Sequence, residues 1–151
     1  MAKIRVTDQW WTAPTESDSG RLIIVTGRGA IEPWRSTGKF IYRIDITWRY
    51  NAGPDGMPDV ATSQLMEQMT DALNDGFRAD PVAVVTGIYT GDGERNVVIY
   101  TRSLTIFQKK LNELLAPLPT LPLAIEAALD EQWEEYDEMR DKTEILDADE
   151  D

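Results

Sequence analysis

The sequence contains no cysteine and no histidine among its 151 residues. Without cysteine there is no disulfide framework, no thiolate metal site and no cysteine nucleophile. Without histidine the chain lacks the usual general base at neutral pH and the commonest ligand of transition metals. Ser-His-Asp and Cys-His catalysis are therefore excluded. These absences favour a non-catalytic protein, and we predict no cofactor and no metal.

Long apolar runs are also missing, since none approaches the roughly 18 to 20 residues that a membrane span needs. The segment MAKIRVTDQWW at the start lacks the apolar stretch of a secretory signal. We therefore predict a cytoplasmic protein with no membrane partner. With 42% hydrophobic and 28% charged residues, the chain has the apolar content for one core, and we expect a single globular domain over residues 1–140.

Basic residues are scarce, and the net charge is −12. Most of this excess lies at the C-terminus, because residues 130–151 carry twelve acidic and two basic side chains. From Asp141 on, the segment DKTEILDADED has too little apolar content to offset the entropy of ordering, which predicts an acidic disordered tail over residues 141–151. The simplest interpretation is a solubility tail, and the alternative is an electrostatic arm for a basic partner or an autoinhibitory mimic of nucleic acid.

Apolar periodicity predicts strands at residues 21–28, 40–50, 82–90, 95–103 and 123–129. The segment FIYRIDITWRY alternates strictly, with Arg43, Asp45 and Arg49 on its polar face. Helical spacing predicts helices at residues 62–77, capped by Thr62 or Ser63, and at 104–115, capped by Ser103.

After the last strand, Asp130 is a candidate cap for a short acidic helix. In that helix Trp133 and Tyr136 share one face, and we expect this face to fold back onto the domain. The order of elements then contains two consecutive β-α-β units joined by a hairpin. We predict an α+β fold, a ferredoxin-like α/β sandwich with an extra N-terminal strand and a short C-terminal helix.

The segment Gly91-Asp92-Gly93-Glu94-Arg95 joins two predicted strands. An Asp-Gly pair between two β-rich runs is typical of a tight hairpin, because glycine adopts the positive φ that the turn requires. A phosphate-binding loop would lead into a helix instead. We therefore predict a turn, and a magnesium-dependent carboxylate enzyme using Asp92, Glu94 and Arg95 is kept as an alternative function.

The polar face of the predicted sheet is a candidate binding surface. It would present Arg43, Arg49, Tyr100 and Arg102, which makes RNA binding through an open sheet face a second alternative. Against it, the aromatic row Phe40, Tyr42, Trp48 and Tyr50 falls on the opposite, apolar face, and the net charge repels phosphate. We therefore expect no nucleic acid partner.

Our preferred function is a protein-interaction or regulatory module whose partner is another protein, with a basic partner and a homodimer both left open. The candidate contact residues in the acidic C-terminal segment are Trp133, Glu134, Glu135 and Tyr136. The apolar strand at residues 82–89 could pair with a second copy, or the first strand could cover it. Trp10, Trp11 and Trp34 are predicted to close the edge of the core as a lid.

Four segments carry a resemblance to a known family: WWTAPTESDSGRLIIVTGR, MPDVATSQLMEQMTDAL, DPVAVVTGIYTGDGERNVVIYTRS and LPLAIEAALDEQWEEYDEM. Together they resemble the uncharacterised bacterial family known as domain of unknown function 695, over most of the chain up to about Met139. That family is in turn distantly similar to RraB, the regulator that binds and inhibits RNase E. The resemblance implies a ferredoxin-like core and a protein-binding regulator, and it carries over no functional site.

Overall fold

The computed structural model describes residues 9–148, which form six strands and four helices. The strands are β1 (Trp10–Glu16), β2 (Leu22–Arg28), β3 (Tyr42–Arg49), β4 (Ala83–Gly91), β5 (Glu94–Thr101) and β6 (Leu123–Leu129). The helices are α1 (Glu32–Arg35), α2 (Val60–Ala79), α3 (Leu104–Leu115) and α4 (Glu134–Ala148). The strands form one antiparallel sheet in the order β1-β2-β4-β5-β3-β6, so the predicted α+β class is confirmed.

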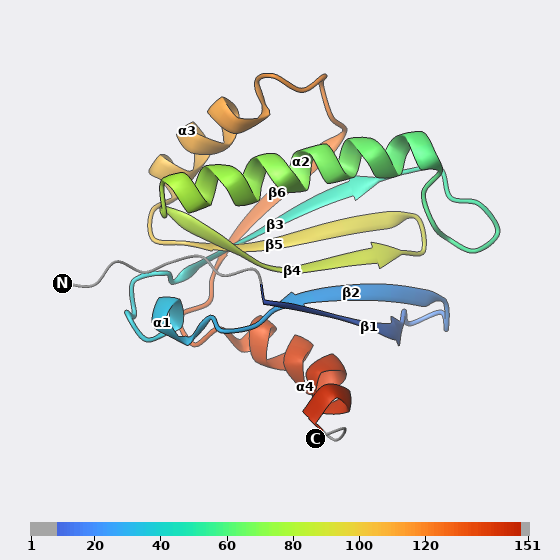
Figure 1. The fold of residues 1–151 in the computed structure, drawn as a ribbon, viewed down its shortest axis with the longest axis horizontal. Coiled ribbons are helices and arrows are strands. Elements are labelled where there is room, and N and C mark those ends of the chain that lie inside the picture. The colour runs from blue at the N-terminus through green and yellow to red at the C-terminus, as the bar shows by residue number, and fades with distance from the viewer. Residues whose placement is uncertain (1–8, 149–151) are drawn as a thin grey trace.

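Helices cover both faces of this sheet, and Figure 1 shows α2 and α3 on one face and α1 and α4 on the other. We call these the α2–α3 face and the α4 face. On the α2–α3 face, Ile44, Ile46 and Trp48 of β3 pack against the apolar stripe of α2. Phe77 of α2 and Phe107 of α3 are both buried, with ring centroids 6.1 Å apart. Burial of each such side chain contributes about 1.5–3 kcal/mol, so this core fixes both helices on the sheet.

The α4 face carries a second core, although we predicted this face to be open. Val84 of β4 and Val98 of β5 are buried there beneath Trp133 and Met139 of the C-terminal segment. The prediction is wrong for this part of the sheet because β4 and β5 carry apolar residues on both faces, and such strands need cover on each side. The alternation of β3 alone did not reveal this requirement.

The N-terminal hairpin adds two strands to the sheet, one more than we predicted. β1 pairs with β2 from Trp10 opposite Arg28 to Glu16 opposite Leu22. Pro14 obscures β1 in the sequence, but an edge strand tolerates proline because its missing N–H can point away from the sheet. Trp10 and Trp11 lie in this strand and pack half-buried against the two cores, and Trp34 is 1% exposed within the core of the α4 face, which is consistent with the predicted lid.

The middle of the chain departs from prediction in two details. α2 begins at Val60, and the Asp59 carboxylate caps it by accepting a 2.8 Å hydrogen bond from the Thr62 amide, so neither Thr62 nor Ser63 is the cap. β4 lies between β2 and β5 and pairs with both, so residues 82–89 are not available to pair with a second copy. The cap of α3 is confirmed, since the Ser103 hydroxyl accepts from the Ile106 amide.

The C-terminal helix folds back onto the domain, as predicted, but it is longer than expected. α4 continues to Ala148, past Asp141, where we expected the acidic tail to begin. Thr143 is 1% exposed, and its hydroxyl accepts a 2.8 Å hydrogen bond from the Trp11 indole of β1. This contact with β1 accounts for helical structure beyond residue 140. Of the predicted tail, residues 149–151 lie outside the described residues.

Candidate interaction surface

The glycine-rich corner is a two-residue turn between β4 and β5. Gly91 pairs with Glu94, and Asp92 and Gly93 form the turn with φ angles of 50° and 81°. The Asp92 carboxylate lies 3.5 Å from the Arg21 guanidinium and accepts a 3.3 Å hydrogen bond from Ser19. Across residues 9–148 of the structure, no group of three or more acidic side chains could hold a metal ion. The predicted hairpin is confirmed, and local contacts account for Asp92.

The predicted arginines lie apart and have different environments. Arg43 is held on the α4 face by Asp45, with Nε 3.1 Å from the carboxylate, and by Asp130 at 3.7 Å. Arg49 lies at the end of β3 with a side chain that is 81% exposed, and it forms a 3.0 Å ion pair with Glu94. Arg102 is exposed beyond the end of β5. The structure therefore does not bring these three side chains together into one basic surface.

The predicted aromatic contacts Tyr100, Trp133 and Tyr136 all belong to the core of the α4 face, with exposed fractions of 0, 1 and 1%. Tyr100 and Trp133 stack with ring centroids 4.2 Å apart, and the Trp133 indole donates a 2.8 Å hydrogen bond to the Phe40 carbonyl. Burial raises the pKa of Tyr100, and the Asp130 carboxylate that accepts its hydrogen bond raises it further. These side chains hold α4 on the sheet, and a partner cannot contact them while α4 is docked.

The two glutamates of the predicted site differ sharply. Glu134 is exposed in the first turn of α4. Glu135 points toward the sheet and accepts a 2.5 Å hydrogen bond from the Tyr89 hydroxyl. Burial raises the pKa of Glu135 despite this hydrogen bond, and the neighbouring Asp45 carboxylate adds to the effect. Only Glu134 is therefore placed to meet a partner.

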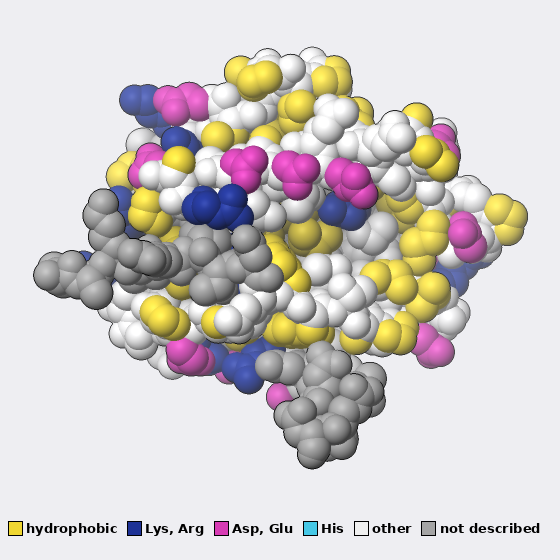
Figure 2. All heavy atoms as spheres, in the orientation of Figure 1, with side chains coloured by type: hydrophobic (Ala, Val, Ile, Leu, Met, Phe, Trp, Pro, Cys, Tyr) yellow, Lys and Arg dark blue, Asp and Glu magenta, His cyan; other side chains and the backbone are white. Residues whose placement is uncertain are grey.

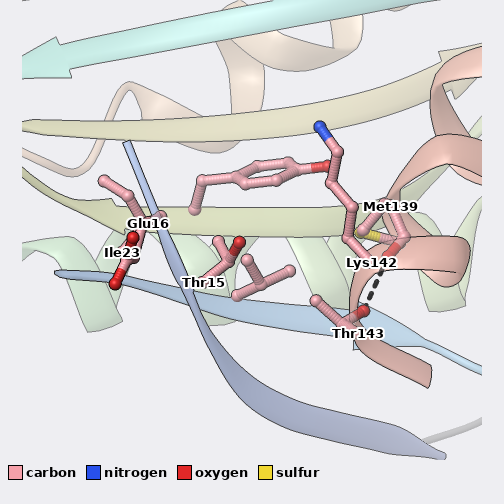
Figure 3. Close-up of a pocket in the computed structure, with 8 residues that line it drawn as sticks. Thr15, Glu16, Ile23, Met139, Lys142 and Thr143 are labelled. Atoms are coloured by element: carbon pink, nitrogen blue, oxygen red, sulfur yellow. Dashed lines mark hydrogen bonds between the residues drawn. The ribbon is translucent and has the colours of Figure 1, made fainter. Parts of the chain in front are cut away.

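A depression of about 170 Å³ lies between α4 and the strands β1, β2 and β4 (Figure 3). Figure 3 shows Glu16 and Lys142 at its opposite ends, with Met139 and Thr143 on the α4 side. Pockets for small organic ligands usually enclose about 300–1,000 Å³, so this depression is small for such a ligand. It marks the place where α4 packs on the N-terminal hairpin.

Acidic side chains form a row along the exposed side of α2, as Figure 2 shows. The exposed acidic residues of this helix are Glu67, Asp71 and Asp75, spaced by one helical turn. Like charges at this spacing cost about 0.2–0.5 kcal/mol per pair in a helix. The row repels phosphate and so disfavours nucleic acid on the α2–α3 face.

β6 is the least protected part of the sheet. It lies at one end of the strand order and, within residues 9–148, pairs with β3 alone. Residues 124–129 are all exposed, with Ile125 at 50% and Leu129 at 62%. Edge strands usually carry a proline, charged side chains or a bulge that prevents pairing with another chain. β6 has no proline, Glu126 is its single charged residue, and its register with β3 is regular.

The opposite edge strand, β1, differs from β6 because it contains Pro14 and contacts α4. Beside the start of β6, a shallow groove of about 320 Å³ is lined mainly by apolar residues of α3 and of the following loop, among them Leu115, Leu118, Leu121 and Leu123. The candidate interaction surface is therefore the β6 edge, residues 123–129, with this groove at one end.

The sequence predicted β6 correctly as a strand but did not reveal its exposure. The alternation of Leu123, Ile125, Ala127 and Leu129 predicted a core face, whereas all but Leu123 are exposed. A usable signal was present in Ala124, Ala127 and Ala128, because small side chains cover little surface and indicate weak packing.

Within residues 9–148, none of the helices combines the length and the apolar composition that a membrane-spanning helix needs.

Comparison with known proteins identifies a family but no relative of known function. The model of the family of unknown function DUF695 matches residues 9–139. No curated protein matches the chain, and no solved structure matches it. The predicted distant similarity to RraB thus stays a prediction. Because the match spans most of the sequence, the chain belongs to the family of unknown function DUF695.

Proposed function

We propose that the protein is a cytoplasmic, non-catalytic protein-interaction module that binds its partner by pairing an extended segment with β6. The observation that carries this proposal is the unprotected β6 edge, where Ile125 and Leu129 are 50 and 62% exposed. A sheet edge presents a row of backbone donors and acceptors, and an added strand satisfies them while its side chains pack beside those of the edge.

The energetics favour such an addition. Each backbone hydrogen bond contributes about 0.5–1.5 kcal/mol net. Full burial of an isoleucine or leucine contributes about 1.5–3 kcal/mol, so covering two side chains that are about half exposed adds about 1–2 kcal/mol each. These gains are comparable with the ordering cost of a short extended segment, which predicts specific but moderate affinity.

We also propose that the central part of the fold is a ferredoxin-like sandwich. In support, the units β3-α2-β4 and β5-α3-β6 are joined by the β4–β5 hairpin, and their strands lie in the order β4-β5-β3-β6. Both crossover helices lie on one face (Figure 1). In this arrangement the last strand of the second unit is an edge, which explains why β6 is available for pairing.

The proposal is tested with the double variant Ile125→Lys/Leu129→Lys, which places two charges on the edge without changing buried side chains. Tagged wild-type protein and variant are used to capture proteins from lysate, and the captured proteins are quantified by mass spectrometry. Val60→Lys is the control, because Val60 is 74% exposed at the start of α2 and is not part of β6.

The expected result is a partner that the wild type and the Val60→Lys variant retain and the double variant loses. Hydrogen exchange on the purified complex should then show slower exchange of β6 amides. Equal capture by the double variant and the control, with unchanged β6 exchange in the complex, refutes the proposed function.

A further inference from the structure

We infer that the strand that pairs with β6 is β6 of a second copy of this chain, in antiparallel orientation about a twofold axis at Ala127. The inference rests on the proposed function and specifies its partner. When two copies of one strand pair antiparallel about a twofold axis, the numbers of any two facing residues add up to twice the number of the residue on the axis. The axis can therefore lie at only a few residues of β6. The charges on the sheet distinguish these registers.

The register of β6 with β3 fixes which charges lie near the edge. Glu126 is opposite Asp45, and Ala128 is opposite Arg43. These four side chains point to the α4 face, while Ile125 and Leu129 point to the other face. Glu126 is the only charged residue of β6, and in the monomer its β3 neighbour has the same charge.

An axis at Glu126 is electrostatically unfavourable. It would align Asp45, Glu126, Glu126 of the second copy and Asp45 of the second copy in one row across four strands. Neighbouring strands lie about 4.8 Å apart, so four carboxylates would stand side by side. Like charges directly opposite each other destabilise a sheet.

An axis at Ala127 removes this conflict. Glu126 then lies opposite Ala128 of the second copy, and Arg43 of the second copy is the next residue in the row. Two strand spacings separate Glu126 from that arginine, about 9.6 Å between backbones, and the small Ala128 side chain leaves room for the arginine to approach. The Arg43 side chain is 28% exposed and pairs with Asp45 and Asp130 of its own chain, and this register would add Glu126 of the second copy to the group.

The same register also matches the apolar side chains. Ile125 lies opposite Leu129 of the second copy, and the reciprocal pair forms by symmetry, so both exposed apolar residues of each chain are covered. An axis at Ile125 would pair residues 123–127 and leave Leu129 uncovered. Of these three axes, the one at Ala127 satisfies both charge and apolar pairing.

The test uses the variants Ala128→Glu and Glu126→Lys/Ala128→Glu in sedimentation velocity over a concentration series. Within one chain, a carboxylate at position 128 faces Arg43 and a lysine at position 126 faces Asp45, so both variants keep a stable monomer. In the Ala127 register, Ala128→Glu creates two Glu–Glu pairs across the interface. The double variant converts both into Lys–Glu pairs.

We expect the wild type to pass from 17.1 kDa to twice that mass as its concentration rises. Ala128→Glu should raise the dimer dissociation constant about 2- to 30-fold, from two unfavourable pairs, and the double variant should restore or tighten the dimer. Circular dichroism and thermal melting confirm that each variant is folded.

Three results would overturn the inference. A wild type that stays monomeric throughout the series excludes the dimer. A dimer insensitive to Ala128→Glu excludes the β6 interface, and a weakened dimer that the double variant fails to restore excludes the Ala127 register. If the wild type is monomeric but Ile125→Lys/Leu129→Lys still abolishes capture of another protein, the inference fails while the proposed function stands.

Discussion

The substitution Asp130→Ala should destabilise the protein strongly, because one carboxylate joins three elements directly after β6. Its Oδ2 accepts a 2.7 Å hydrogen bond from the Tyr100 hydroxyl of β5. Its two oxygens also accept from the amides of Glu134 and Glu135, at 2.9 and 3.3 Å, and so cap α4. Asp130 is 8% exposed, and water does not readily replace it.

The magnitude follows from these contacts. Loss of an N-cap costs about 0.5–2 kcal/mol. Tyr100 is fully buried, and leaving its hydroxyl without an acceptor costs about 1–3 kcal/mol. The free energy of unfolding should therefore fall by about 2–5 kcal/mol, which corresponds to a decrease in melting temperature of roughly 4–20 °C for a chain of this size.

Urea denaturation monitored by tryptophan fluorescence measures the loss, and two further variants locate its cause. Asp130→Asn keeps one acceptor oxygen but puts an NH2 donor in place of the other, so it should lose about 1–3 kcal/mol, less than Asp130→Ala does. Tyr100→Phe combined with Asp130→Ala should cost less than the two single changes together, by about 1 kcal/mol. A loss below about 1 kcal/mol for Asp130→Ala, or strict additivity of the double variant, would refute this account.

Three further substitutions give distinct outcomes. Gly91→Ala should cost more than about 2 kcal/mol in urea denaturation, because its Cβ would lie 2.3 Å from the Leu22 carbonyl oxygen, and a neutral effect would contradict this packing. Arg49→Ala should change stability by less than about 0.5 kcal/mol, because its ion pair is exposed, and a larger loss would show the pair to be structural. The Glu135→Gln variant should gain stability relative to wild type as the pH rises from about 4 to about 8, and a difference independent of pH would contradict the burial of this carboxyl.

The sign of the Glu135 prediction follows from the raised pKa of the buried carboxyl. The folded protein binds a proton at Glu135 more readily than the unfolded chain does. At a pH where Glu135 of the unfolded chain is ionised, the buried carboxyl therefore lowers the free energy of unfolding of the wild type. This penalty disappears as the pH falls through the raised pKa to the ordinary value of about 4.3. Glutamine carries no charge at any pH, and the comparison therefore isolates this group.

Features encoded by neighbouring residues could be predicted from the sequence. The alternation in β3, the Ser103 cap and the Asp92-Gly93 turn depend on contacts within a few residues, and all three are confirmed. β1 was missed because Pro14 is a strand breaker except at an edge, and its position at the edge follows from pairing with β2. Local patterns contain little information about which strand lies at an edge.

The candidate surface depended on such non-local information. Ile125 is apolar and alternates correctly, so the pattern predicts burial, yet it is 50% exposed on a strand at the edge of the sheet. Tyr100 and Trp133 lie far apart in the sequence and were predicted as surface contacts. Their stacking becomes evident only when α4 folds back over β5.

The position of α4 determines which surface remains for a partner. Because Trp133, Tyr136 and Met139 fill the α4 face, the aromatic side chains that suggested an open recognition surface are used within the fold, and Arg43 is paired with Asp45 and Asp130. Exposing them would require undocking α4, which would leave the buried Tyr100 hydroxyl and the Phe40 carbonyl without their partners. Pairing at β6 requires no such rearrangement, since residues 124–129 are already exposed. The proposed pairing at β6 would therefore keep both cores intact, whereas binding at the α4 face would not.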